Sequence, residues 1–200
     1  AAESIAYRTS GLVYQALAAK ARDDRPTLDD KLAMLSEFSA ECAIAKVHTS
    51  EAYNHLADEA VQVFGGYGFS EESPPARMYR DSRIARIYEG TNEICRLYAQ
   101  RAILRRSWSG RLDLNGDGEY GGSSLSSASY GEALGLDSRR SDIEGLKNVY
   151  LYLVAAVCAV VERERMFDPE NQQLISSLAD VAIEIFAAER VFLRVSKGLS

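Results

Sequence analysis

The sequence is poor in cysteine and proline, and its charge is mildly negative rather than basic. It has three cysteines and four prolines in 200 residues, and a formal net charge of -6. The cysteines (Cys42, Cys95 and Cys158) lie far apart and are odd in number, so we expect neither a disulfide framework nor a Cys-x-x-Cys metal site. Reduced thiols in the cytoplasm are the simplest interpretation. The acidic balance argues against non-specific nucleic-acid binding, which needs a basic surface.

Long apolar runs are also scarce. The longest nearly pure run covers residues 149–161, which is 13 residues. A membrane-spanning helix needs about 20, so the run predicts a buried helix and no integral membrane span. No basic segment followed by an apolar one opens the sequence. Since the chain begins with Ala1 rather than methionine, we expect a processed product or a portion of a longer protein.

Helical periodicity is what the sequence does contain. No strand pattern of convincing length appears, so the predicted fold class is all-α. Residues 28–64 carry a pattern so long that either one helix or two nearly continuous helices would explain it, with the following glycines ending it. The expected helices cover residues 1–22, 28–64, a short turn after Pro75, 91–106, 142–165 and 170–197.

A change of composition divides the chain. Residues 107–141 are rich in glycine and serine and lack a clean period, which indicates a linker or a long surface loop. Residues 1–106 are predicted to form an antiparallel helical bundle. Residues 142–200 are predicted to add an antiparallel helical pair, with Asp168 and Pro169 at the start of its second helix, as an incomplete further region.

One short stretch partly matches a calcium-binding loop. Asp113, Asn115, Asp117 and Gly118 stand at positions one, three, five and six of an EF-hand pattern, but Ser124 stands where a bidentate acid belongs. A polar turn built of turn-forming residues is the favoured interpretation, and calcium binding is the alternative.

Other short motifs carry little chemistry. His48, Glu51 and His55 share a helix face, but the two histidines stand seven residues apart, about 10 Å along a helix, which is too far for one zinc ion. We therefore expect no metal site. The sequence also has no phosphate-binding loop, no full Gly-x-Gly-x-x-Gly and no Gly-x-Ser-x-Gly.

Residues 62–93 interrupt the helical pattern with chemistry of their own. One glycine would cap the preceding helix, so the adjacent pair Gly65 and Gly66 indicates main chain that comes close to a ligand or another chain. Glu89 lies between apolar neighbours and Gly90. It is either a solvated carboxylate at a helix start or a base whose pKa apolar surroundings raise. The pattern favours the two interpretations equally.

The same stretch carries a multi-part motif. It holds a Gln-x-x-Gly-Gly turn, an aromatic-rich loop, an Arg-Asp pair and an Ile-Tyr-Glu-Gly-Thr segment. These stand at Gln62, Gly65 and Gly66, residues 67–69, Arg80 and Asp81, and residues 87–91. In that order and spacing they resemble the C-terminal helical domain of the acyl-CoA dehydrogenases. Residues 148–195 are similar to the added C-terminal helices of the very-long-chain type and its bacterial relatives, so the resemblance is weakest across 107–141.

This resemblance implies an FAD-dependent dehydrogenation of fatty acyl-CoA to trans-2-enoyl-CoA. Glu89 would be the base that removes the α-proton, while flavin N5 accepts the β-hydride. The backbone N–H of Glu89 would polarise the thioester carbonyl. Tyr88 and Gly90 would line the acyl pocket. An acceptor of the electron-transfer flavoprotein type would reoxidise the flavin.

The resemblance also implies how FAD is held. Gln62, Gly65 and Gly66 match the turn that binds the adenosine diphosphate part of FAD, commonly from a neighbouring subunit, which implies a homo-oligomer. Thr91 and the residue two positions later contact FAD in the family. That later residue is Glu93 here, where some members have glutamine.

Two domains of the family, an N-terminal helical one and a middle β-domain, have no counterpart in the sequence. Those domains supply most flavin and substrate contacts, so we expect these 200 residues alone to bind little FAD and to be inactive. The chain would then be part of a longer enzyme or would pair with a second chain. A non-catalytic helical assembly module of the same family is the alternative function.

Overall fold

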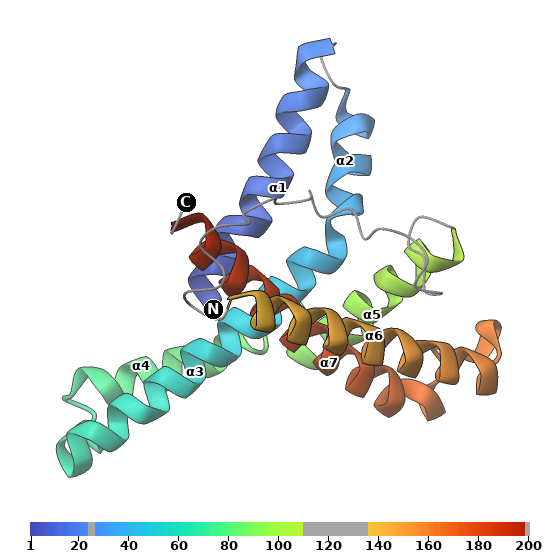
Figure 1. The fold of residues 1–200 in the computed structure, drawn as a ribbon. Coiled ribbons are helices and arrows are strands. Elements are labelled where there is room, and N and C mark those ends of the chain that lie inside the picture. Colours follow the sequence, from blue (N-terminus) through green and yellow to red (C-terminus); the bar gives the residue numbers. More distant parts are fainter. Residues whose placement is uncertain (24–26, 110–135, 199–200) are drawn as a thin grey trace.

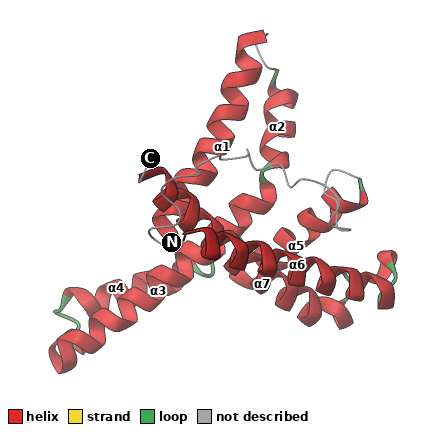
Figure 2. Cartoon of the chain, viewed as in Figure 1, coloured by secondary structure: helices red, strands yellow, loops and turns green. Residues whose placement is uncertain are grey.

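The computed structural model describes residues 1–23, 27–109 and 136–198. Within these ranges the chain is helical and has no strand, which confirms the all-α class (Figure 2). Two 3-10 turns, Arg163–Arg165 and Pro169–Asn171, precede the last helix. The helices are α1 (Ala2–Asp23), α2 (Leu28–Glu37), α3 (Ser39–Phe69), α4 (Pro74–Ala85), α5 (Asn92–Trp108), α6 (Leu136–Val160) and α7 (Gln172–Gly198).

The helices form antiparallel pairs that meet near the middle of the molecule (Figure 1). α1 lies beside α2, α3 beside α4, and α6 beside α7. α5 packs against both α3 and α7, while α1 also contacts these two helices. As a result, the α3–α4 hairpin projects from the centre as an arm, with the chain reversal at its tip (Figure 1).

The main hydrophobic core is shared by both halves of the chain. α3 and α5 contribute to it from the first half, and α6 and α7 from the second. Burial of one such aliphatic side chain stabilises the fold by about 1.5–3 kcal/mol. The division into units 1–106 and 142–200 stays a prediction. The buried members are Ala40, Ile103, Leu104, Tyr150, Val154, Met166, Ile175, Leu178, Ala182 and Ile185.

The long helical pattern is two helices, as one of the two interpretations had it. Thr27 caps α2 through a capping box with Asp30. Phe38 is both the C-cap of α2 and the N-cap of α3. The prediction that the glycines end the second helix is confirmed in part, because the helix is interrupted by a kink at Gly65. Gly65 alone leaves helical geometry, at φ 60° and ψ -143°, and the helix resumes and runs to Phe69.

α4 is longer than the short turn predicted after Pro75. It begins at Pro74 in the first-turn position that proline favours and continues for 12 residues. Packing along α3 supplies the stability that local propensity did not indicate, and it buries Ser82 completely.

The two helices that flank the predicted linker, residues 107–141, both extend into that range. α5 extends to Trp108, and α6 begins at Leu136 and ends at Val160 rather than spanning 142–165. The candidate calcium loop, residues 113–124, lies outside the described residues.

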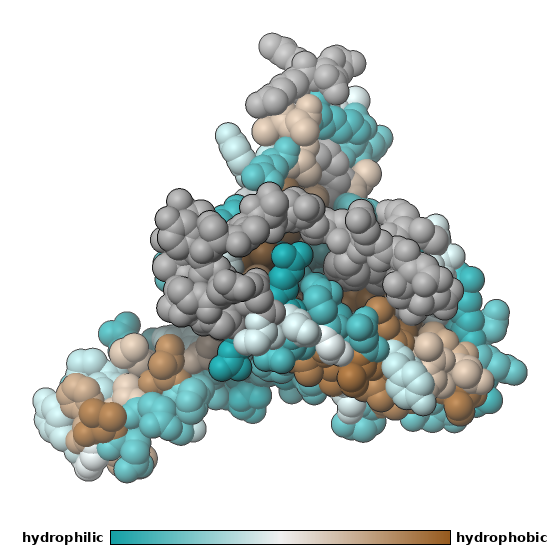
Figure 3. All heavy atoms as spheres, viewed as in Figure 1, coloured by the Kyte–Doolittle hydropathy of each residue, from teal (hydrophilic) through white to brown (hydrophobic). Residues whose placement is uncertain are grey.

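α6 is not the buried helix that its apolar run predicted. Tyr150 and Val154 face the core, but Val149, Tyr152 and Val160 are 55%, 73% and 86% exposed. Figure 3 shows hydrophobic surface over this part of the molecule. By length and composition alone, Ser138–Val160 could cross a membrane, with 11% of its most apolar window buried. The absence of an integral membrane span therefore stays a prediction.

Tyr150 supplies the first testable prediction, because its hydroxyl donates to buried Gln100 Oε1 at 2.9 Å and so connects α6 to α5. Tyr150→Phe should lower the free energy of unfolding by about 1–2 kcal/mol, since it removes a donor from a buried acceptor. Tyr152→Phe is the matched control, because Tyr152 is 73% exposed. Urea unfolding measures both variants. Equal midpoints would show that the bond contributes nothing.

Candidate active site

The loop between α4 and α5 has an unusual backbone. Glu89 has a φ of 54°, and among the described residues it is the one non-glycine residue with positive φ. Gly90 follows with a φ of 92°. A non-glycine residue in this region costs of order 1–3 kcal/mol and persists only where its surroundings hold it, which is commonest at functional sites.

The Glu89 side chain lies open to solvent. Its neighbours Ile87, Tyr88 and Ile94 are apolar but are themselves 47%, 53% and 60% exposed. The described residues therefore do not enclose the carboxylate, in agreement with the solvated carboxylate, which is one of the two interpretations that the sequence left open. These three exposed apolar residues, the apolar rim, lie close to Glu89 along the chain.

The side-chain amide of Asn92, the first residue of α5, is fully buried. Lys46 Nζ donates to Asn92 Oδ1 at 2.6 Å, and Asn92 Nδ2 donates to Ser50 Oγ at 2.9 Å and to Glu51 Oε1 at 3.2 Å. Lys46, Ser50 and Glu51 all belong to α3. An amide buried without partners would be costly, so these bonds fix the start of α5 against α3.

Further hydrogen bonds hold the loop at both ends. Lys46 Nζ also donates to the Gly90 carbonyl at 2.7 Å. The Asn92 backbone N–H donates to the Arg86 carbonyl at 3.0 Å. Thr91 is the N-cap of α5, and its hydroxyl accepts from the Ile94 N–H at 3.3 Å. The left-handed Glu89–Gly90 segment is thereby held between two fixed helix ends.

The network continues to the C-terminal helices through Arg96. Arg96 Nη2 donates to Glu51 at 2.7 Å, and Nε donates to Asp180 of α7 at 2.5 Å. Burial by itself lowers the pKa of Arg96, but the bonds to Asp180 and Glu51 outweigh it and leave the pKa raised. Asn54 Nδ2 of α3 donates to the Ser82 hydroxyl of α4 at 2.9 Å. α3, α4, α5 and α7 therefore all support the loop.

Glu93 lies exposed in the first turn of α5. A hydrogen bond from its own backbone N–H and one from the Thr91 hydroxyl hold the pKa of Glu93 below its ordinary value. The carboxylate is thus ionised at neutral pH, where the N-terminus of a helix favours negative charge.

Gln62, Gly65 and Gly66 lie at the other end of the α3–α4 arm, and all three are exposed (Figure 1). Gly65 stands 19 residues after Lys46 along α3, a distance of about 28 Å at 1.5 Å per residue. Within one chain the glycine turn and the Glu89 loop cannot contact the same ring system of a ligand.

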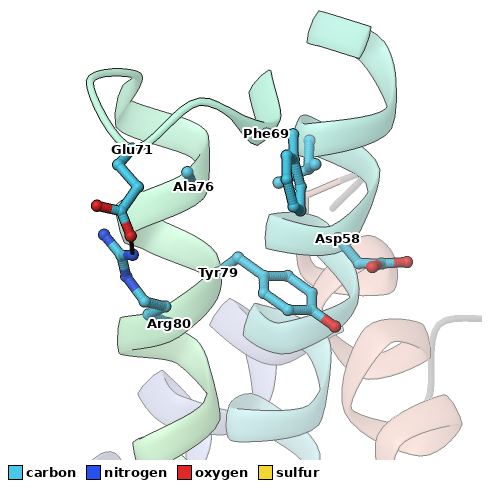
Figure 4. A pocket seen from close by; sticks show the side chains of 7 residues that line it. Asp58, Phe69, Glu71, Ala76, Tyr79 and Arg80 are labelled. Carbon is cyan, nitrogen blue, oxygen red and sulfur yellow. Dashed lines mark hydrogen bonds and ion pairs between the residues drawn. The ribbon is translucent and has the colours of Figure 1, made fainter. Parts of the chain in front are cut away.

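A cavity of about 480 Å³ lies between α3 and α4 near the tip of the arm (Figure 4). Arg80, from the Arg-Asp pair of the motif, donates to Glu71 at 2.8 Å across its edge. Buried Gly68 lies beside it, and a Cβ there would come within 2.7 Å of the Val61 carbonyl. The lining residues are Asp58, Val61, Phe69, Glu71, Ala76, Tyr79 and Arg80.

The structure brings together Tyr88, Glu89, Gly90, Thr91 and Glu93, and leaves Gln62, Gly65 and Gly66 apart from them.

The sequence did not predict a role for four residues of the buried network, Lys46, Ser50, Asn92 and Arg96. Their only sequence signal is polar residues on the inward face of an apolar helical pattern. Glu51, which shares a helix face with His48 and His55, also belongs to this network. The described residues hold no cluster of three or more His, Cys, Asp or Glu side chains that could bind a metal.

The chain matches known proteins along its whole length. The family model "Acyl-CoA dehydrogenase, C-terminal domain" matches residues 5–104. A probable acyl-CoA dehydrogenase of Bacillus subtilis (strain 168) is 32% identical over 202 residues, covering 100% of this chain and 34% of that protein. The human mitochondrial very long-chain specific acyl-CoA dehydrogenase is 32% identical over 186 residues, covering 82% of this chain and 28% of that protein.

A solved structure agrees with these relatives. The crystal structure of an acyl-CoA dehydrogenase complexed with FAD from Bacillus anthracis matches with a TM-score of 0.77 and 28% identity. The match covers 98% of this chain and 33% of that one. The chain thus spans about a third of the length of the proteins that it matches.

Gly65 and Gly66 provide a matched pair for the second prediction. Neither has an atom within 4 Å of an added Cβ, but only Gly65 has a positive φ. Gly65→Ala should therefore lower the free energy of unfolding by about 1–3 kcal/mol through backbone strain alone. Gly66→Ala should stay within about 1 kcal/mol of the parent. Thermal unfolding compares them, and equal melting temperatures would refute the special role of Gly65.

Proposed function

The chain belongs to the acyl-CoA dehydrogenase family, and we propose that it forms the C-terminal part of an FAD-dependent enzyme and contributes its catalytic base. The reaction is the α,β-dehydrogenation of a fatty acyl-CoA to the trans-2-enoyl-CoA. The observation that carries the proposal is the left-handed backbone of Glu89, which a buried network holds in place. Strain maintained by so many partners is typical of a positioned functional group.

The Glu89 carboxylate acts as the base. It removes the α-proton of the acyl thioester, so that the α-carbon–hydrogen bond breaks and the proton passes to the carboxylate oxygen. The Glu89 backbone N–H makes no backbone hydrogen bond within the described residues, so it is available to the thioester carbonyl oxygen. A donor at that oxygen stabilises the negative charge that develops as the proton leaves.

Tyr88 and Gly90 border the acyl chain in this proposal. Tyr88 contributes to the exposed apolar rim beside Glu89. A Cβ at Gly90 would meet Cys95 Sγ at 3.3 Å, and its φ of 92° disfavours any other residue. The glycine therefore leaves the approach to the carboxylate open.

The residues at both ends of the arm fit a flavin dinucleotide. The exposed main chain at Gly65 and Gly66, with Gln62 one turn earlier, suits a pyrophosphate, because no atom lies within 4 Å of where a Cβ would stand at either glycine. Thr91 and Glu93 lie beside the base. FAD, when bound, supplies the acceptor for the β-hydride. The 28 Å between the two ends supports a homo-oligomer, in which one chain's glycine turn reaches a neighbour's cofactor.

Other parts of the proposal rest on the family and on composition. An electron-transfer flavoprotein-type protein is the proposed electron acceptor. The three free cysteines support a reducing, cytoplasmic compartment. We also propose that these 200 residues alone are inactive, because they leave the Glu89 carboxylate exposed.

The alternative is a non-catalytic assembly module that uses the same helices as a subunit interface. The exposed apolar arm tip favours it, since Val63 and Phe69 are each 81% exposed. Visible absorbance of the purified full-length protein separates the two functions. Flavin bands support the dehydrogenase, and a colourless protein that regains no flavin supports the module.

Glu89→Gln in the full-length protein is the direct test of the base. We expect kcat with acyl-CoA to fall by about 10²–10⁴-fold, because an amide cannot accept the α-proton. FAD binding should persist. Glu184→Gln, an exposed carboxylate on α7, is the matched control and should keep parental turnover. Normal turnover of Glu89→Gln would show that another group is the base.

A further inference from the structure

We propose that Lys46 is a positioning residue for the Glu89 base, acting through the carbonyl of Gly90 and the side chain of Asn92. The inference rests on the proposed function of Glu89. Lys46 lies on α3, far from Glu89 in the sequence, and its Nζ bridges Gly90 O at 2.7 Å and Asn92 Oδ1 at 2.6 Å. One side chain thus joins the base-bearing loop to the buried anchor beneath it.

The geometry explains why an ammonium group suits this place. Lys46 has three N–H donors on one nitrogen, and two of them are used on oxygens of different residues. Hydrogen bonds from a charged donor are about twice as strong as neutral ones. Because glycine has no Cβ to restrict its backbone, the orientation of the Gly90 carbonyl depends on its partners, which are Lys46 Nζ at 2.7 Å and, more weakly, Cys95 Sγ at 3.5 Å.

The orientation of Gly90 decides where Glu89 points. Glu89 and Gly90 are consecutive left-handed residues, with φ of 54° and 92°. If the Gly90 carbonyl turned away, Glu89 could relax to negative φ. Its carboxylate would then leave the α-carbon of the substrate, and its N–H would leave the thioester carbonyl oxygen. A displacement of about 1 Å at a reacting group can cost 10²-fold in rate. Lys46 therefore affects the proton-transfer step without touching the substrate.

The role of Lys46 can be separated from overall stability. Both hydrogen-bond acceptors of Lys46 Nζ are neutral oxygens. The nearby Glu51 carboxylate already pairs with Arg96 at 2.7 Å and with Arg86 at 3.9 Å. Removing the lysine charge therefore leaves no carboxylate without a cation. Lys46 is also only partly buried, so a side chain of similar length can take its place.

The experiment uses the full-length enzyme with FAD bound and compares Lys46→Met with Lys31→Met, an exposed lysine of α2. We expect Lys46→Met to lower kcat at least tenfold, with KM and flavin content within threefold of the parent. The kinetic isotope effect with α-deuterated acyl-CoA should rise, because proton removal becomes rate-limiting. Lys31→Met should match the parent in every measurement.

A rescue distinguishes positioning from packing. Propylamine added to Lys46→Ala should restore part of kcat, since the amine can supply the missing donors. Lys46→Gln, whose side chain is one atom shorter but keeps a neutral donor group, should retain more of kcat than Lys46→Met. Lys46→Met with parental kcat and isotope effect overturns the proposal, and so does a loss of kcat that only parallels lost flavin.

The outcomes also separate this inference from the proposed function. If Glu89→Gln is slow while Lys46→Met is normal, Glu89 remains the base and the positioning role is wrong. If Glu89→Gln turns over normally, the base assignment fails, and the role of Lys46 fails with it.

Discussion

The burial of one amide side chain, that of Asn92, is the constraint on which the rest of the site depends. An amide away from water must find partners, and those of Asn92 come from α3. Satisfying them holds the first turn of α5 against α3 in one position. The loop that joins α4 to α5 then has little freedom, and its strained backbone at Glu89 becomes tolerable because the fixed helix ends hold it.

The same helix that supplies these partners also sets the dimensions of the arm. α3 runs for 31 residues, with the Asn92 partners near its start and the glycine turn near its end. A long helix therefore separates the two segments that are proposed to bind FAD and substrate, although the motif places them close together in the sequence. In an oligomer, such a spacing lets each chain act on its own substrate and reach the cofactor of a neighbour, which is the arrangement proposed above.

Local signals predicted the parts of the fold that local forces determine. Helical periodicity located α1, α3, α5 and α7, and the start of α5 was predicted near Thr91, which is its N-cap. α4 and the exposed face of α6 were misjudged. Packing on α3 stabilises α4, and an apolar run such as 149–161 does not reveal which of its faces a neighbour covers.

The candidate site divides in the same way. Apolar neighbours made Glu89 a candidate base and the family motif gave it a reaction, whereas the positive φ values of Glu89 and Gly90 could not be read from the sequence. Lys46 and Asn92 were missed because their contact joins residues 46 positions apart and exists only in the folded chain. Long-range polar pairs of this kind leave no periodic trace in a single sequence.

The most direct test of the central claim is a crystal structure of the full-length protein with FAD and a bound acyl-CoA analogue. The account predicts a positive φ at Glu89, a buried Asn92 amide, and Lys46 Nζ within hydrogen-bond distance of the Gly90 carbonyl. It also predicts that the Glu89 carboxylate faces the α-carbon of the analogue. A negative φ at Glu89, with Lys46 turned away into solvent, would contradict it.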